Sequence, residues 1–284
     1  MTAPTTTIVG PTVTEPRARF RDLLAAEWTK LWSLRSTYWT LLLSALVIIG
    51  LNVNAAVADY RNWPRYGADI RAIFVPIWAM RDAFPQGAGM VLMLAAGSVG
   101  AITLTGEYGT GLIRTTFAAV PARRSLVTAK LIDVTVVMLG YGTVVAGVSF
   151  WATQTILSGR HASLSIGYPG AFQAVAASAV LAPVCALIGM GIGAIVRHSA
   201  ATMVITTVVI LLLPIFFTDH YRWTADIKHA LPASAWGRLV DVGYGRFGFA
   251  VHRPTTTTEA WIALALWSLG AAVVAVTVVH RRDV

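Results

Sequence analysis

The residues of this chain best suited to polar contacts lie in one stretch, 106–130, between two long apolar runs. An acid stands among glycines at its start, a proline interrupts it, and cations follow; the residues that define this pattern are Glu107, Gly111, Arg114, Pro121, Arg123, Arg124 and Lys130. Side chains of these types form ion pairs and charge-assisted hydrogen bonds. The stretch is therefore predicted to be a polar, basic insert that a soluble partner grips from the cytoplasm.

Patterns for covalent chemistry do not accompany the insert. The chain has 6 histidines but no HExxH pair, and it contains neither a GxSxG elbow nor a Walker GxxxxGK[ST] loop. We therefore expect no catalytic residue, no metal site and no cofactor bound by this chain. If the protein moves cargo uphill, the energy must come from ATP hydrolysed by a separate subunit.

Composition indicates an integral membrane protein. Charged residues make up 12% of the chain and hydrophobic residues 56%, whereas roughly 25% of the residues of a soluble domain are charged. The net charge of +9 is also found in nucleic-acid-binding proteins. Here the cations stand at the ends of apolar segments, where they favour anionic lipid head groups. Membrane lipids, and no nucleic acid, are the expected partners.

Six stretches are long enough to cross a membrane, which takes about 20 apolar residues in a helix. They are residues 39–58, 86–105, 131–157, 170–196, 200–217 and 260–279. An even number places both termini on the same side. The arginine doublets 123–124 and 281–282, both close to span ends, favour the cytoplasm for that side. The predicted fold class is an all-α integral membrane protein with both termini cytoplasmic.

The segment before the first span is predicted to be a separate amphipathic helix. Residues 1–17 are expected to be a disordered tail, residues 18–36 a helix in the membrane interface, and residues 37–284 the six-span domain. In 18–36 the apolar residues recur at helical spacing; they are Phe20, Leu23, Leu24, Trp28, Leu31 and Trp32. At least five charges make this segment too costly to insert, because each costs about 3 kcal/mol at mid-bilayer.

Glu27 falls on the apolar stripe of this helix and has two interpretations. It either reaches the surface or pairs locally with Lys30 or Arg35, or it meets a cation of the 106–130 insert or of a partner. Two further expectations concern helix packing and one long connection. Gly189 and Gly193 form a GxxxG pair that lets helix backbones approach closely. The connection 218–259 is too long to lack secondary structure and should contain short helices.

Together these features resemble the permease subunit of a type-2 ABC exporter. The resemblance covers most of the chain: an interfacial helix with Glu27, Lys30 and Arg35, then six spans. Between spans two and three, the order of acid, glycine and arginine, followed by Pro-x-Arg-Arg and lysine, is similar to the coupling helix of that family.

The resemblance implies a transport function, in which two permease subunits pair and each docks a separately encoded ATPase. The second permease is either another copy of this chain or a homologue. Residues 106–122 would enter a cleft of the ATPase, and the complex would lie in the plasma membrane. The second and fifth spans would line the cargo path, where this chain offers an apolar surface suited to amphipathic or lipid-like cargo: Met90, Met93, Ile205, Val209 and Leu213.

Two other classes of protein are also considered. An intramembrane hydrolase or protease would usually carry paired glutamate and histidine residues within its spans, which this sequence does not show. A non-transporting membrane scaffold would need no ATPase, and its insert would be only a basic, lipid-binding helix. A neighbouring reading frame with a Walker loop would favour transport.

Overall fold

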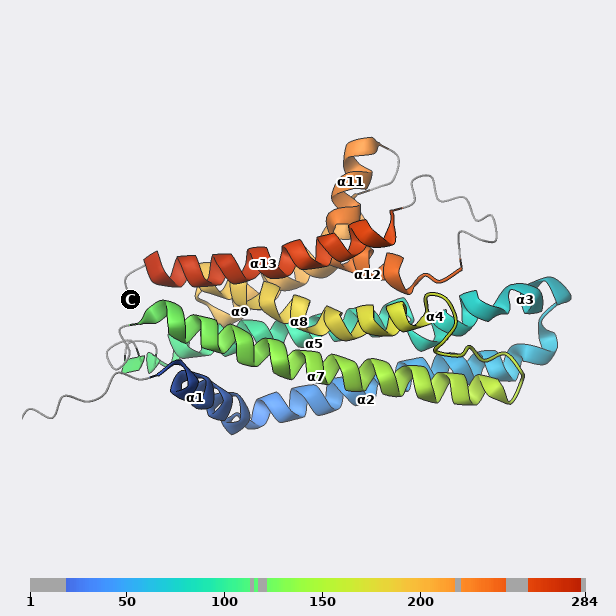
Figure 1. The fold of residues 1–284 in the computed structure, drawn as a ribbon, viewed down its shortest axis with the longest axis horizontal. Helices are drawn as coiled ribbons and strands as arrows, with labels where there is room; N and C mark the ends of the chain where they lie inside the picture. The colour runs from blue at the N-terminus through green and yellow to red at the C-terminus, as the bar shows by residue number, and fades with distance from the viewer. Residues whose placement is uncertain (1–18, 113–114, 117–121, 218–220, 244–254, 282–284) are drawn as a thin grey trace, which may run out of the picture.

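Residues 19–112, 115–116, 122–217, 221–243 and 255–281 are described in the computed structural model of this chain, and all their regular elements are helical (Figure 1). In this part of the chain, 6 helical stretches are long and apolar enough to cross a membrane, which matches the predicted number and approximate positions of the apolar helices. They run alongside one another as α2 (Arg35–Asn62), α5 (Gln86–Gly109), α7 (Arg123–Ser158), α8 (Ala171–Val196), the run α9 (Ser199–Thr207), η3 (Val208–Leu212) and α10 (Leu213–Phe216), and α13 (Thr257–Arg281).

The outer faces of these helices expose large apolar side chains. Leu46 of α2 is 60% exposed, Val144 of α7 is 63% exposed, and Leu269 of α13 is 64% exposed. Exposure of apolar surface to water costs about 25 cal/mol per Å², whereas hydrocarbon imposes no such cost. The surface therefore suits a membrane-embedded protein.

Helix α8 forms the centre of the bundle, and 78% of its most apolar window is buried. Glycines allow its backbone to approach that of α5 closely. A Cβ atom on Gly189 would lie 2.2 Å from the carbonyl oxygen of Gly97, and one on Gly100 would lie 1.9 Å from that of Ala186. The packing role predicted for Gly189 is confirmed, because no larger residue fits between these backbones.

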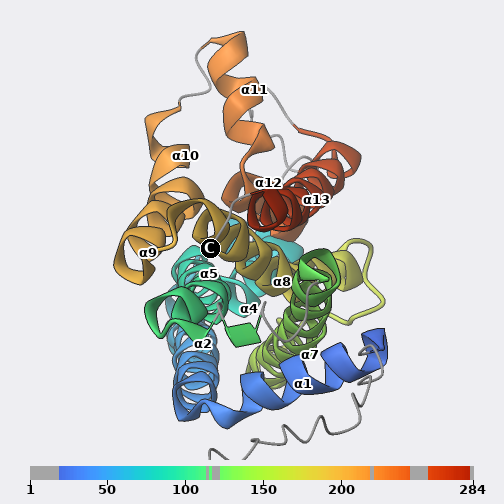
Figure 2. The same ribbon diagram turned by 90° about the vertical axis from the view of Figure 1, so that its left-hand side faces the viewer.

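Helix α1 (Phe20–Ser33) lies across one end of the bundle (Figure 2). It packs mainly against α7. The last turn of α5, the first turn of α7 and the last turn of α13 lie at this same end (Figure 1). Leu23 and Leu31 of α1 are buried, whereas Phe20 and Trp28 are each 42% exposed. The expected apolar stripe is therefore divided between the bundle and the outer surface.

Short helices follow several of the long helices, and the group after α2 lies at the end of the molecule opposite α1 (Figure 1). After α2 come η1 (Trp63–Arg65), α3 (Ala68–Ile73), η2 (Phe74–Trp78) and α4 (Ala79–Ala83). Within 218–259, the expected short helices are present as α11 (Arg222–Ala230) and α12 (Pro232–Val240). Helix α12 reaches into the bundle through Trp236, which is 3% exposed and whose Nε1 donates to Ser178 Oγ at 3.0 Å.

Candidate functional site

Four charged residues from three separate helices meet where α1 crosses the bundle. Glu27 and Lys30 come from α1, Glu107 from the last turn of α5, and Lys130 from α7. Lys30 Nζ lies 2.6 Å from Glu27 Oε1 and 3.2 Å from Glu107 Oε1. Lys130 Nζ lies 2.8 Å from Glu107 Oε1 and also donates to Glu27 Oε2. We call these four residues the ion network.

Helical periodicity places Glu27 in the ion network. Leu23, Glu27 and Leu31 are spaced by four residues, so they share the face of α1 that is buried against the bundle. Glu27 is only 1% exposed and Lys130 only 3%. Both interpretations of Glu27 are thus realised together, because it pairs locally with Lys30 and also meets a cation from the predicted insert.

The ion network is balanced, with two carboxylates and two ammonium groups. Burial opposes the charge of Lys30, but its hydrogen bond to Glu27 and the nearby Glu107 carboxylate outweigh this effect and raise its pKa. Buried charges are tolerated only when they are paired and hydrogen-bonded. The network therefore holds α1, α5 and α7 in one fixed arrangement at this end of the bundle.

The helices on either side of the predicted insert extend further than the sequence indicated. Helix α5 continues through Gly109, and α7 already begins at Arg123. Only residues 110–122, which we call the α5–α7 connection, lie between them. Residues 106–109 and 123–130 instead form the helix ends that carry Glu107 and Lys130.

Two residues after the end of α5, the chain has a glycine with left-handed backbone conformation. Gly111 has a φ of +71°, and its N–H donates to the carbonyl oxygen of Tyr108 at 3.3 Å. Glycine adopts this conformation without the steric cost that a Cβ atom imposes. Gly111 thus ends the helix and sets the direction in which the chain continues.

The other residues expected at the insert have different surroundings. Arg123 is half-buried and Arg124 is exposed, both in the first turn of α7, while Arg35 starts α2 and is exposed. Arg114 and Pro121 lie outside the described residues.

The expected cargo-path residues are not on one open surface. Met93 is buried at 2% exposure, whereas Met90 and Ile205 are 36% and 39% exposed. Val209 and Leu213 are half-buried. Helices α5 and α9 pack side by side, so Met93 belongs to the interface between them in this conformation.

Two contacts that the sequence reasoning missed join the end of α5 to the α8–α9 turn. The guanidinium of Arg197 lies 5.0 Å from the centre of the Tyr108 ring, and Thr105 Oγ1 lies 2.9 Å from Ser199 Oγ. The sequence signal for the first contact was Arg197, a cation that lies between the fourth and fifth spans on the same predicted side as the insert. A further missed residue is Leu112, an apolar side chain that is 51% exposed in the α5–α7 connection.

No known family model and no curated protein matches this chain.

Proposed function

We propose that this chain is the permease subunit of an ATP-driven ABC exporter. Two permease subunits would form the cargo path, and a separately encoded ATPase would dock on the α5–α7 connection of each. The complex would lie in the plasma membrane with both termini in the cytoplasm, and its cargo would be amphipathic or lipid-like. The observation that carries the proposal is that both ends of the α5–α7 connection are tied to one buried ion network.

This arrangement supports a mechanical role for the connection. Glu107 precedes the connection and Lys130 follows it, and the two side chains lie 2.8 Å apart. A force applied to the connection would therefore reach α5 and α7 together, and Glu27 would pass it to α1. Rigid helices would carry the displacement along the bundle, since packed elements transmit motion more readily than loops.

The contacts at the α8–α9 turn extend this route to the fifth span. Through Tyr108–Arg197 and Thr105–Ser199, the last turn of α5 holds the start of α9. Helices α5 and α9 belong to the second and fifth spans, which would line the cargo path where two permease subunits meet. ATP-driven movement of the connection would thus act on both walls of the path.

The charges at the start of α7 also favour an anionic surface beside the connection. Arg123 and Arg124 occupy the first turn of α7, and that turn contains no acidic residue. Cations at a helix N-terminus oppose the helix dipole at a cost of about 0.3–1 kcal/mol each. Acidic side chains of a docked ATPase, or lipid head groups, would offset this cost at the exposed Arg124.

The test is co-purification of the tagged chain with the ATPase encoded by a neighbouring gene. Leu112→Glu should abolish co-purification and stimulated ATP turnover, because a charge replaces an exposed apolar contact in the connection. The matched control is Ile70→Glu in α3, which also replaces an exposed apolar residue, 40% exposed, but at the opposite end of the molecule. It should leave assembly and turnover unchanged.

The same experiment can reject the proposal. If Leu112→Glu and Ile70→Glu behave alike, the α5–α7 connection is not the docking element. If no ATPase associates and ATP has no effect on the chain, a non-transporting scaffold becomes the better interpretation.

A further inference from the structure

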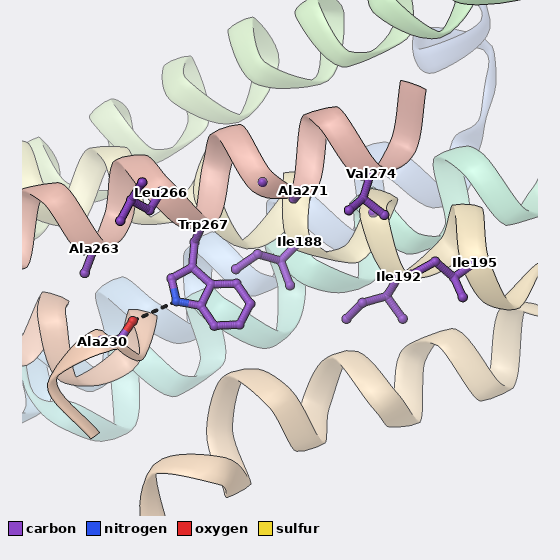
Figure 3. A pocket seen from close by; sticks show the side chains of 11 residues that line it. Ile188, Ile192, Ile195, Ala230, Ala263, Leu266, Trp267, Ala271 and Val274 are labelled. Carbon is purple, nitrogen blue, oxygen red and sulfur yellow. Dashed lines mark hydrogen bonds between the residues drawn. The ribbon is translucent and has the colours of Figure 1, made fainter. Parts of the chain in front are cut away.

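An apolar groove with a volume of about 390 Å³ lies between α8 and α13 (Figure 3). Its walls include Ile188, Ile192, Ile195, Leu266, Trp267 and Val274. The only polar side-chain atom among its lining residues is Trp267 Nε1, which already donates to the carbonyl oxygen of Ala230 at 2.7 Å. A polar group placed in the groove would therefore lack a partner, at a cost of several kcal/mol. The occupant must be apolar.

Small residues create the groove. Helices α8 and α13 approach closely at Gly191, where a Cβ atom would lie 3.0 Å from the carbonyl oxygen of Ala271. Gly270 of α13, one turn before Val274, also lines the groove. A Cβ atom added at Gly270 would have no neighbouring atom within 4 Å. The larger side chains on either side form the walls, so the groove is a trough along the two helices.

The groove favours a long, thin occupant. On α13 the lining runs from Ala263 to Val274, which at 1.5 Å per residue is about 16 Å. A helix of about 10 Å diameter would lie over the groove and fill it only with its side chains. An unbranched hydrocarbon chain is long, thin and wholly apolar, and it fits all three requirements.

Exposed cations of α13 lie beyond one end of the groove. Trp267 and Ala230 of α11 lie toward one end, and Ile195 and Val274 lie at the other (Figure 3). Beyond Val274, α13 continues for about 10 Å to His280 and Arg281, both of which are exposed. Anionic lipid head groups are attracted to cations that flank an apolar membrane helix.

We propose that this groove binds one acyl chain of an anionic phospholipid, whose terminal methyl points toward Trp267 and whose head group lies at Arg281. The bound chain fills the trough between α8 and α13 and holds the two helices together. This site does not depend on ATP or on the proposed transport function.

The test uses the full chain purified without an ATPase and reconstituted in phosphatidylcholine vesicles. The vesicles contain a small fraction of phosphatidylglycerol with a photoreactive diazirine on its acyl chain. Peptides that cover 188–195 and 263–274 should take up the label. Excess unlabelled phosphatidylglycerol should remove it, whereas excess phosphatidylcholine should not. If both lipids dilute the label equally, it reports only the surrounding bilayer, and the proposal is wrong.

Gly270→Phe should fill the groove and cause loss of the label. The matched control is Gly147→Phe on the exposed face of α7, where the Cβ position is equally free of neighbours. Labelling that persists in Gly270→Phe would overturn the proposal. A crosslink between two copies through α13 would also overturn the proposal, if Gly270→Phe abolishes it and phosphatidylglycerol does not compete with it. The groove would then be a subunit contact.

Arg281→Gln provides a second variant that leaves the groove unaltered. It should abolish the preference for phosphatidylglycerol over phosphatidylcholine while the labelled peptides stay the same. A preference that survives this substitution would overturn the assignment of the head group to this end of α13.

Discussion

Replacement of Lys130 by methionine should destabilise the protein far more than the same replacement of Lys30. Both lysines contact the same two carboxylates, but the Lys130 side chain is 3% exposed and that of Lys30 is 40% exposed. Lys130→Met leaves the buried Glu27 carboxylate with Lys30 as its only partner in the network, which then has a net charge of −1. Loss of one partner from a buried ion pair costs about 3–5 kcal/mol. For an exposed pair the cost is about 0–1 kcal/mol.

The assay is reversible unfolding of the purified chain in mixed detergent and dodecyl sulfate micelles, followed by circular dichroism at pH 7. The pKa of Lys30 is raised above its ordinary 10.5. Its contribution to stability is therefore complete below that value and is lost only as the pH rises through the raised pKa. Lys30 is thus charged under the conditions of the assay.

A double substitution separates the ion network from general packing. In Glu27→Gln with Lys130→Met, one acid and one cation are lost together, and Lys30 and Glu107 remain as a balanced pair. The double variant should be less destabilised than the sum of the single variants, by about 0.5–3 kcal/mol. If Lys130→Met instead costs less than about 1 kcal/mol, the buried network does not hold α1 to the bundle.

Three further outcomes follow from the fold and the proposed orientation. Arg124→Cys should react with an impermeant maleimide only after cells are permeabilised, whereas Ile70→Cys should react in intact cells; labelling of position 124 from outside would reverse the orientation. Gly100→Ala should cost about 1–3 kcal/mol or more through overpacking, while Gly147→Ala should stabilise α7 by up to about 1 kcal/mol, as thermal unfolding can measure. Gly111→Ala should cost about 1–2 kcal/mol in the left-handed conformation and reduce ATP turnover of the assembled complex; unchanged turnover would show that the direction set by this residue is unimportant.

The six apolar helices and one close helix contact were predictable from local sequence patterns. Hydropathy over about 20 residues is sufficient to identify a candidate span, and the 6 helices follow the predicted stretches. The helical spacing of the apolar residues predicted α1 itself, but only part of its expected apolar stripe, including Leu23 and Leu31, is buried. Gly189 marked a place where two backbones meet, because a residue without a side chain in an apolar helix permits close approach.

Other features were decided by the tertiary structure. Glu27 and Lys130 are 103 residues apart in the sequence, and only the crossing of α1 over the ends of α5 and α7 brings them together. The α5–α7 connection is also shorter than the insert predicted from the sequence. Residues 106–109 and 123–130 belong to the ends of α5 and α7, where Glu107 and Lys130 pair with α1. Met93 and Met90 were equivalent in the sequence, yet only Met93 faces a neighbouring helix.

The sequence by itself therefore determined an all-helical chain with six apolar helices and a separate amphipathic helix before them. The tertiary structure determined which charges pair and where small residues leave a groove between α8 and α13. The physical reason is that hydropathy and helical period are properties of neighbouring residues. An ion pair or a cavity depends instead on which distant helices lie side by side.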